Sequence, residues 1–269
     1  MNGVALFAIS YDAVDILAAF AAEHDITYPL LSDDGSCVMR ELSLINERVQ
    51  DDHAVYGITP NPRHVDLPYP GVFVLNGDGV ITDKRFYDSY RERETGSGLV
   101  AQALGIFAEP SAPAVIDGPV VTARAWLDSP TYVWFQRLTL TVELTIAPGF
   151  HVYGSPVPEG LVPLSVEIDA IDGLEVTPAR WPAARSLELP GLGDRLTGHA
   201  GVVRGTVSLT FTAAPGTGDH MIRITVRYQG CDEAACLMPS SVRLQLPVRE
   251  AALVGRSLPG STAQTRRGG

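Results

Sequence analysis

The second half of the chain alternates apolar and polar residues with a period of two. Apolar residues in such a stretch fill one face of a β-strand and polar residues the other. Glycine and proline separate the stretches, and no helical periodicity interrupts them. The clearest stretches are 138–146, 206–212, 222–228 and 242–248, with weaker ones around Val166 and Val176. This pattern predicts an antiparallel β-sandwich over residues 120–250.

The first half has a different pattern, in which short apolar runs alternate with helical periodicity. Val4–Ile9 is a continuous apolar run, typical of a strand buried on both faces of a mainly parallel sheet. Apolar residues at helical spacing follow from Asp12 to Glu23, with Asp12 as the expected N-cap. The turn Asn76–Gly79 predicts a hairpin between two strands. In chain order we expect strand 4–9, helix 12–23, short strand 26–31, helix 36–49, strands 71–75 and 80–86, and helix 98–107.

The two patterns predict two domains, an α/β domain at residues 1–108 and the β-sandwich at 120–250. Residues 109–119 lie between them and contain three prolines, which stiffen the chain and predict a semi-rigid linker. Residues 251–269 are polar and small, which predicts a disordered tail.

Charge and hydropathy exclude several classes of function. The chain has 269 residues and a net charge of −11, most of it in the first 110 residues. Excess acid argues against binding to nucleic acids or to anionic membranes. No apolar run approaches the roughly 20 residues that span a bilayer, so we expect no direct membrane insertion. No phosphate-binding glycine loop or Ser/His/Asp signature occurs, and we expect no cofactor.

The most specific chemical feature is a pair of cysteines, Cys231 and Cys236, between two predicted strands. A disulfide that closes so short a loop stabilises a fold by only about 2 kcal/mol, whereas a loop of about 100 residues gives nearly 5. A short, exposed disulfide is the labile kind that takes part in exchange. These considerations favour a redox role, and a structural bond is the alternative.

The residues around this pair bear on its chemistry in two ways. Zinc needs four ligands, and the nearest histidines, His199 and His220, have no evident spacing relation to the cysteines, so we expect no metal site. Asp232 and Glu233 lie between the thiols, and their negative charge should raise the pKa of both thiols. Such a pair suits reaction with a more acidic cysteine of a partner.

Two phrases of the first domain, Ile26-Thr-Tyr-Pro-Leu-Leu-Ser-Asp-Asp-Gly35 and Tyr69-Pro-Gly-Val-Phe-Val-Leu-Asn-Gly-Asp-Gly79, resemble the AhpC/TSA family of peroxiredoxins and redoxins. The resemblance covers residues 3–105 and implies a thioredoxin-like fold. In that family the catalytic cysteine lies upstream of the position of Val4. We therefore expect an incomplete thioredoxin-like domain that lacks its catalytic corner.

The same resemblance bears on two residues of this domain. Pro70 resembles the cis-proline that faces the active site in thioredoxin folds. Cys37 is the only thiol among residues 1–110 and begins the second predicted helix, where a helix N-terminus can lower the pKa of a thiol. It is either a reactive thiol or, as we favour, a small half-buried residue without a role in catalysis.

The phrase Tyr228-Gln-Gly-Cys231-Asp-Glu-Ala-Ala-Cys236-Leu-Met-Pro239, with Gly149-Phe-His-Val-Tyr-Gly154 upstream, resembles the N-terminal domain of the thiol:disulfide interchange protein DsbD. The resemblance spans residues 120–248 and implies an immunoglobulin-like sandwich. It also implies that Cys231 and Cys236 are the redox pair, with Tyr153 packed beside them and Tyr228 in the conserved phrase. The family's shielding cap loop would fall near 185–196, where this chain has leucines but no aromatic residue.

Three functions follow as hypotheses. The first is a thiol–disulfide redox protein that passes electrons through Cys231 and Cys236 to or from a thioredoxin-like or membrane-embedded exchange protein. The second is a docking module for such a partner, with an inert cysteine pair. The third is a thiol peroxidase that uses Cys37.

Localisation and assembly depend on the first domain. The family of the second resemblance works in the periplasm, but Met1–Ser10 has no signal-peptide pattern. We expect a periplasmic protein if the sequence is N-terminally shortened, which the missing catalytic segment favours, and a cytoplasmic one as it stands. An open sheet edge in the first domain would predict a dimer.

Overall fold

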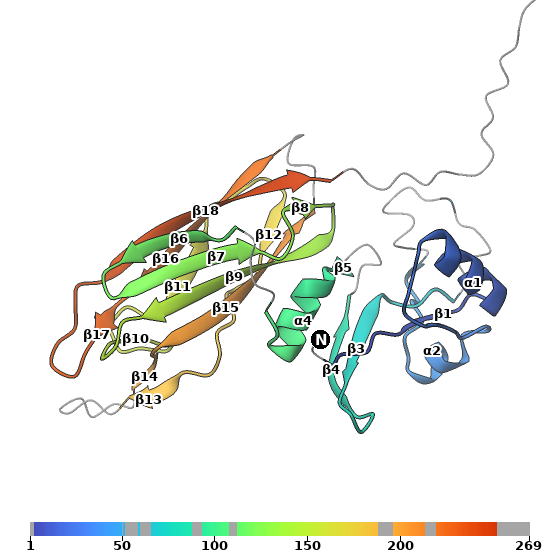
Figure 1. Ribbon diagram of the computed structural model, residues 1–269, viewed down its shortest axis with the longest axis horizontal. Helices are drawn as coiled ribbons and strands as arrows, with labels where there is room; N and C mark the ends of the chain where they lie inside the picture. The colour runs from blue at the N-terminus through green and yellow to red at the C-terminus, as the bar shows by residue number, and fades with distance from the viewer. Residues whose placement is uncertain are drawn as a thin grey trace, which may run out of the picture. The chain divides into compact units, whose positions relative to one another are not determined.

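The computed structural model describes residues 3–49, 51, 59, 66–87, 93–107, 112–187, 196–212 and 219–251. The chain divides into two compact units, Met1–Glu92 and Arg93–Gly269, here called the first and second units. Strands dominate the second unit, and the first mixes strands with short helices (Figure 1). The predicted tail, from residue 252 onward, and residues 188–195 of the expected cap loop lie outside the described residues.

The first unit begins with a strand–helix–strand arrangement. Strand β1 (Ala8–Ser10) pairs in parallel with β2 (Leu30–Ser32), and helix α1 (Val14–Glu23) connects them. A short helix, α2 (Cys37–Glu41), follows β2. A hairpin of β3 (Gly71–Leu75) and β4 (Ile81–Phe86) comes next along the chain. The expected order of elements is therefore present over these residues.

Three details of the first unit differ from the prediction. Strand β1 is shorter than 4–9, and Val4, Leu6, Phe7 and Ile9 are exposed rather than buried on both faces, because β1 pairs only with β2 among the described strands. The N-cap of α1 is Ala13, since the Asp12 carboxylate instead accepts a hydrogen bond from the Ser10 hydroxyl at 2.5 Å. Helix α2 ends at Glu41 instead of residue 49.

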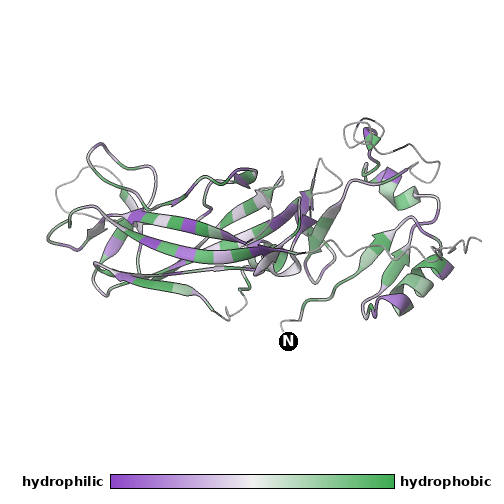
Figure 2. Ribbon diagram, turned by 90° about the horizontal axis from the view of Figure 1, so that it is seen from above, coloured by the Kyte–Doolittle hydropathy of each residue, from purple (hydrophilic) through white to green (hydrophobic). Residues whose placement is uncertain are grey.

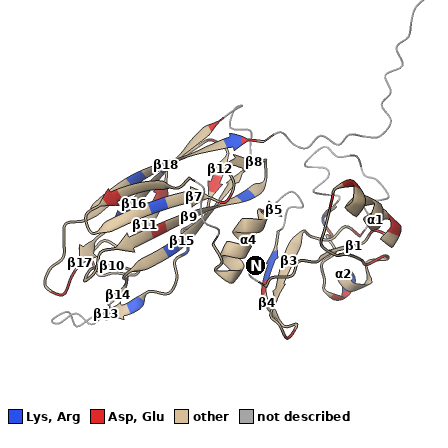
Figure 3. Cartoon of the chain, in the orientation of Figure 1, with Lys and Arg blue, Asp and Glu red and all other residues tan. Residues whose placement is uncertain are grey.

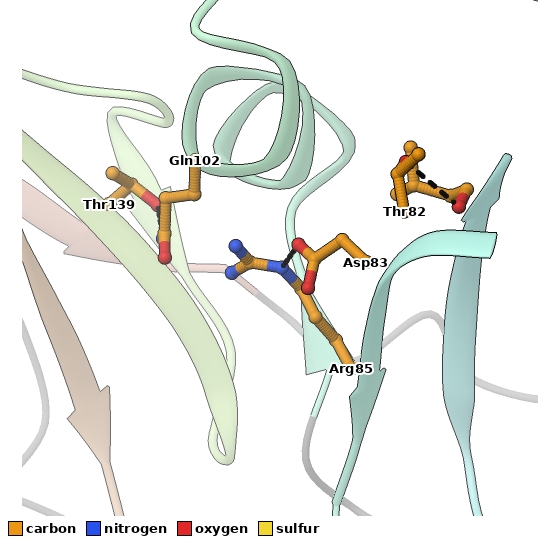
Figure 4. Close-up of polar contacts among 6 residues, drawn as sticks. Thr82, Asp83, Arg85, Gln102 and Thr139 are labelled. Atoms are coloured by element: carbon orange, nitrogen blue, oxygen red, sulfur yellow. Dashed lines mark hydrogen bonds and ion pairs between the residues drawn. The ribbon is translucent and has the colours of Figure 1, made fainter. Parts of the chain in front are cut away.

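The β3–β4 hairpin confirms the predicted turn. The Asn76 side-chain oxygen accepts hydrogen bonds from the amides of Asp78 and Val80, both at 3.0 Å, and Gly79 adopts a positive φ of 78°. Asparagine and glycine at these positions close the turn without steric strain. On β4, Arg85 donates to the Asp83 carboxylate at 2.9 Å (Figure 4).

The second unit contains two larger sheets. One comprises β12 (Leu174–Val176), β15 (Val202–Phe211), β9 (Gln136–Ile146), β7 (Val121–Leu127) and β6 (Ala114–Gly118), in that spatial order. The other comprises β11 (Ser165–Ile168), β16 (His220–Tyr228), β18 (Ser240–Glu250) and β8 (Thr131–Tyr132), also in that order. The four alternating stretches of the sequence form β9, β15, β16 and β18, as predicted.

Both sheets contribute to one hydrophobic core. Its fully buried side chains include Leu138 and Leu140 of β9, Leu209 of β15, and Ile222 and Val226 of β16. Figure 2 shows green apolar positions alternating with polar ones along these strands. The main stabilising contribution of such a core is the burial of apolar surface, which is worth about 25 cal/mol per Å².

The start of the second unit differs from the predicted domain boundary. Strand β6 lies within the segment expected to be a linker and pairs with β7, because its alternating residues Ala114 and Ile116 pack against the core. Strand β5 (Arg93–Glu94) pairs with β9, and helix α4 (Gly96–Leu104) belongs to this unit. The Gln102 amide of α4 donates to the Thr139 hydroxyl of β9 at 2.9 Å (Figure 4).

A buried ion cluster crosses the larger sheet. Glu143 of β9 is 3% exposed and accepts hydrogen bonds from Arg124 of β7 at 2.9 Å and from Arg204 of β15 at 2.5 Å. The three residues are direct partners in the strand register. Figure 3 shows basic and acidic positions on the strands of this unit. The cluster compensates the buried carboxylate with two cations.

A smaller sheet lies at one end of the second unit, away from β8 (Figure 1). It comprises β13 (Arg185–Leu187), β14 (Leu196–His199), β10 (His151–Tyr153) and β17 (Gly230–Cys231), in that order. The sequence did not predict these strands separately, because each has only two to four residues and is too short to show a period.

Candidate functional site

The small sheet positions the two cysteines. Cys231 ends β17, and its register partner on β10 is His151. The chain then turns through Asp232 to Ala235 and returns, so that Cys231 and Cys236 form an isolated antiparallel bridge. The two residues are joined by a disulfide bond, with their Cα atoms 4.1 Å apart.

The two cysteine residues differ in exposure. Cys231 is 0% exposed and packs in a small core cluster with Tyr153 and Leu196. Cys236 lies in the exposed segment after the turn. A thiolate from another protein can therefore approach Cys236, whereas Cys231 is covered.

Tyr153 contacts both sulfurs. Its hydroxyl oxygen lies 3.2 Å from Cys231 Sγ and 3.1 Å from Cys236 Sγ. A disulfide has no S–H, so the hydroxyl is the donor and the sulfurs are weak acceptors. Burial raises the pKa of Tyr153, which keeps the phenol protonated. The structure thus places Tyr153, which the resemblance singled out, beside both cysteines.

Gln229 holds the loops on either side of the disulfide. This residue is buried. Its side-chain oxygen accepts a hydrogen bond from the Val162 amide at 3.0 Å, and its side-chain nitrogen donates one to the Leu237 carbonyl at 3.1 Å. The sequence analysis quoted Gln229 only as part of a phrase. A glutamine at the end of an alternating apolar strand is the signal that could have identified it.

Asp232 organises the turn between the cysteines. Its carboxylate accepts hydrogen bonds from the amides of Ala235 at 2.7 Å and Ala234 at 2.8 Å. These backbone hydrogen bonds lower the pKa of Asp232, so it is ionised at neutral pH. The sequence analysis considered only the effect of this charge on the thiols, and missed its role in the turn.

Tyr228 has a different role from Tyr153. It is buried, and its hydroxyl donates to the Pro119 carbonyl at 2.9 Å. Gly118 lies against it, since a Cβ at that position would be 2.5 Å from the Tyr228 hydroxyl oxygen. Tyr228 therefore joins β16 to the loop before β7, and its hydroxyl is engaged away from the cysteines.

Cys37 and Pro70 belong to the first unit. Cys37 is exposed at the start of α2, not half-buried as expected. At the start of this helix, the carboxylate of Asp33 accepts hydrogen bonds from the backbone amides of Val38 and Met39. The Tyr69–Pro70 peptide is trans, so the expected likeness of Pro70 to a cis-proline is wrong.

A disulfide with an exposed cysteine is of the labile kind that takes part in thiol–disulfide exchange. Comparison with known families points to the same class. Residues 131–247 match the model of the family described as thiol:disulfide interchange protein DsbD, N-terminal, and residues 1–84 match that of the AhpC/TSA family. Both predicted resemblances are confirmed, and together they indicate a thiol–disulfide redox function.

Two solved structures are similar to parts of the chain. The N-terminal periplasmic domain of ScsB from Proteus mirabilis is 15% identical, with a TM-score of 0.38, and the match covers 49% of each chain. The reduced N-terminal domain of DsbD from Neisseria meningitidis is 17% identical, with a TM-score of 0.29, covering 40% of this chain and 74% of that one. The chain thus spans about half the length of the ScsB domain. A search of curated proteins gave no match.

Among the residues that the structure describes, no helix is both long and apolar enough to cross a membrane.

Proposed function

We propose that this protein is a thiol–disulfide redox protein in which the Cys231–Cys236 pair passes electrons to or from a thioredoxin-like partner. The observation that supports this most directly is the contrast between an exposed Cys236 and a fully buried Cys231 within one disulfide. This contrast determines which of the two sulfurs a partner thiolate attacks.

In the proposed reaction a partner thiolate attacks Cys236 Sγ. A bond forms between the partner sulfur and Cys236, the Cys231–Cys236 bond breaks, and Cys231 leaves as a thiolate with the electron pair. The Tyr153 hydroxyl, 3.2 Å from Cys231 Sγ, stabilises that thiolate by a hydrogen bond. A second partner thiolate then attacks the mixed disulfide, Cys236 leaves, and two electrons have passed to the pair.

The surface beside Cys236 suits a protein partner. Leu237 is 38% exposed and Met238 83% exposed, directly after the accessible sulfur. Methionine adapts its shape to varied apolar surfaces. We infer that the partner is a thioredoxin-like or membrane-anchored exchange protein that presents an apolar rim around its own thiol, as the family resemblance implies.

We also infer the finer fold of each unit. The two sheets around one core in the second unit support an immunoglobulin-like sandwich. The parallel β1–β2 pair joined through α1, followed by the β3–β4 hairpin, supports an incomplete thioredoxin-like fold in the first unit.

A redox titration tests the proposed function. The Cys37→Ser protein is equilibrated in thiol buffers of graded potential, free thiols are alkylated, and the products are weighed. We expect a two-electron transition between about −270 and −120 mV, the range of known exchange proteins. A pair that stays oxidised well below about −300 mV would instead support the docking module with an inert disulfide.

Trapping a mixed disulfide tests the order of attack. In Cys231→Ser the exposed Cys236 is free, and it should form a stable mixed disulfide with a thioredoxin-like protein. Cys236→Ser is the matched control and should form much less, because its remaining thiol is buried. Equal trapping by the two variants would contradict the proposed direction. Peroxide consumption that disappears only in Cys37→Ser would favour the peroxidase hypothesis.

A further inference from the structure

His151 is a buried imidazole next to the disulfide that the steps described so far do not use. It is 9% exposed, and its Nε2 atom has no hydrogen-bond partner among the described residues. A buried polar atom without a partner costs free energy, so its presence calls for a functional or structural reason.

The strand register puts His151 on the same face of the small sheet as Cys231. The two residues are direct partners across the antiparallel β10–β17 pair, and such partners point their side chains to the same side. Tyr153 is two residues further along β10, hence on that face too, and its ring meets the imidazole edge-on with centroids 5.5 Å apart. His151, Tyr153 and Cys231 therefore form one cluster.

The buried thiol of Cys231 needs such a neighbour. When the reduced protein passes electrons on, Cys236 is first linked to the partner, and Cys231 must then attack Cys236 Sγ. Only the thiolate is a nucleophile, yet burial disfavours ionisation of a thiol with no access to water. A nearby group that accepts the proton removes this obstacle.

Building on the proposed function, we propose that the imidazole of His151 is the proton acceptor for the Cys231 thiol in this resolving step. The proton moves from Cys231 Sγ to the imidazole of His151, Cys231 attacks Cys236 Sγ, and the new disulfide forms. The bond between Cys236 and the partner sulfur breaks, and the partner leaves as a thiolate with the electron pair. In the opposite direction the imidazolium returns the proton to the departing Cys231 thiolate.

The surroundings suit a base that is neutral before the step. Burial lowers the pKa of His151, and the charge of Asp232 partly opposes this effect. Asp232, ionised in the turn after β17, can stabilise the imidazolium once it forms. Among the described residues, Tyr153 on its own strand and Cys231 on β17 also lie beside the imidazole. On β14, His199 is the partner of Val152 and so lies on the opposite face.

His199 provides a matched control. It too is buried, and burial lowers its pKa as well. It occupies the neighbouring strand of the same sheet, but its partner Val152 belongs to the main core rather than to the cluster of Cys231. Replacing His199 therefore changes a buried histidine of similar character without touching the proposed proton path.

The test follows the two thiols with an aryl disulfide whose released nitrobenzoate thiolate absorbs visible light. In reduced Cys37→Ser protein, Cys236 releases the first thiolate in a bimolecular phase. Cys231 then releases the second in a unimolecular phase that does not depend on reagent concentration. We expect His151→Gln and His151→Phe to slow the second phase by about 100-fold at pH 7, the lower end of what a positioned base contributes. His199→Gln should leave both phases unchanged.

The pH profile separates a proton acceptor from a packing residue. In the parent protein the second phase should level off above the pKa of His151. In His151→Gln its rate should keep rising beyond the ordinary thiol pKa of about 8.5, because burial disfavours the Cys231 thiolate. If both His151 variants keep the rate and pH profile that the second phase has in the parent protein, the proposal for His151 alone is overturned. If the parent protein shows no second phase, Cys231 does not resolve the mixed disulfide, and the proposed function itself fails.

Discussion

Cys231 and Cys236 share one disulfide bond, yet the first is fully buried and the second lies on an exposed segment. The difference arises because Cys231 ends a paired strand of the small sheet, while Cys236 follows a turn that the Asp232 carboxylate closes. In the proposed reaction, local secondary structure thus sets the order of attack. The chemistry around the buried sulfur then determines how easily it leaves and returns.

Replacing Tyr153 by phenylalanine should slow reduction of the disulfide by a small dithiol. A hydrogen bond to a charged group is worth about 1.5–3 kcal/mol, so loss of the hydroxyl donor should slow departure of the Cys231 thiolate by at least about tenfold. Alkylation and mass measurement at timed intervals give the rate. Tyr228→Phe is the control, because it removes a buried hydroxyl that donates to Pro119 instead. Equal rates in the two variants would mean that the Tyr153 hydroxyl does not assist departure.

The sequence predicted the longer elements of the fold well. Strands β9, β15, β16 and β18 each have nine residues or more, and apolar residues alternate with polar ones along them, so their period is visible. The prediction that Val4–Ile9 is buried on both faces was wrong, because hydropathy alone does not show how many partner strands an apolar run will have. The limits of the predicted linker were also inaccurate, since Ala114 and Ile116 pair with β7 despite the neighbouring prolines.

The candidate site was predictable only in part. Cys231, Cys236 and Tyr153 were named from residue chemistry and from family resemblance, and they meet in space. His151 and Gln229 were not singled out, because their roles depend on the pairing of β10 with β17 and on loops 67 residues apart in sequence. Pairing between such short strands cannot be deduced from a period of two.

Replacing Gln229 by leucine should destabilise the second unit. The change leaves the Val162 amide and the Leu237 carbonyl without their side-chain partners, and each unsatisfied buried group costs about 1–3 kcal/mol. We expect the free energy of unfolding, measured in urea, to fall by about 2 kcal/mol or more. Gln245→Leu on the exposed side of β18 should change it by less than about 0.5 kcal/mol. Similar losses in both variants would contradict a bridging role for Gln229.

Asp128 should make stability depend on pH. Burial raises its pKa, against hydrogen bonds from Thr95 and Thr139 that lower it. The fold therefore favours the protonated carboxyl: this contribution is fully present below the unfolded pKa of about 3.9 and is lost as pH rises through the raised value. Asp128→Asn stays neutral, so its melting temperature relative to the parent should increase as pH rises from 4 toward neutrality.

The control for this pH effect is Asp117→Asn. The Asp117 carboxylate also accepts a threonine hydroxyl, from Thr122 at 2.7 Å, but it is exposed. Its difference from the parent should change little over the same pH range, because no burial opposes its charge. A constant difference for Asp128→Asn as well would show that burial of that carboxyl does not affect the stability of the fold.

The Glu143 cluster gives a prediction about the order of stabilities among three variants. The double variant Arg124→Met, Arg204→Met leaves the Glu143 carboxylate, which is 3% exposed, without either cation. Removing the partners of a buried charge in this way costs about 3–5 kcal/mol. Adding Glu143→Leu removes that uncompensated charge and fills the site with an apolar side chain. The triple variant should therefore unfold at a higher urea concentration than the double variant, although it differs from the natural chain at one more position. Glu143→Leu alone leaves both guanidinium groups able to reach water, since their side chains are 32% and 40% exposed, and should cost less than the double change. If the triple variant is no more stable than the double one, the arginines stabilise the sheet by packing rather than by neutralising Glu143.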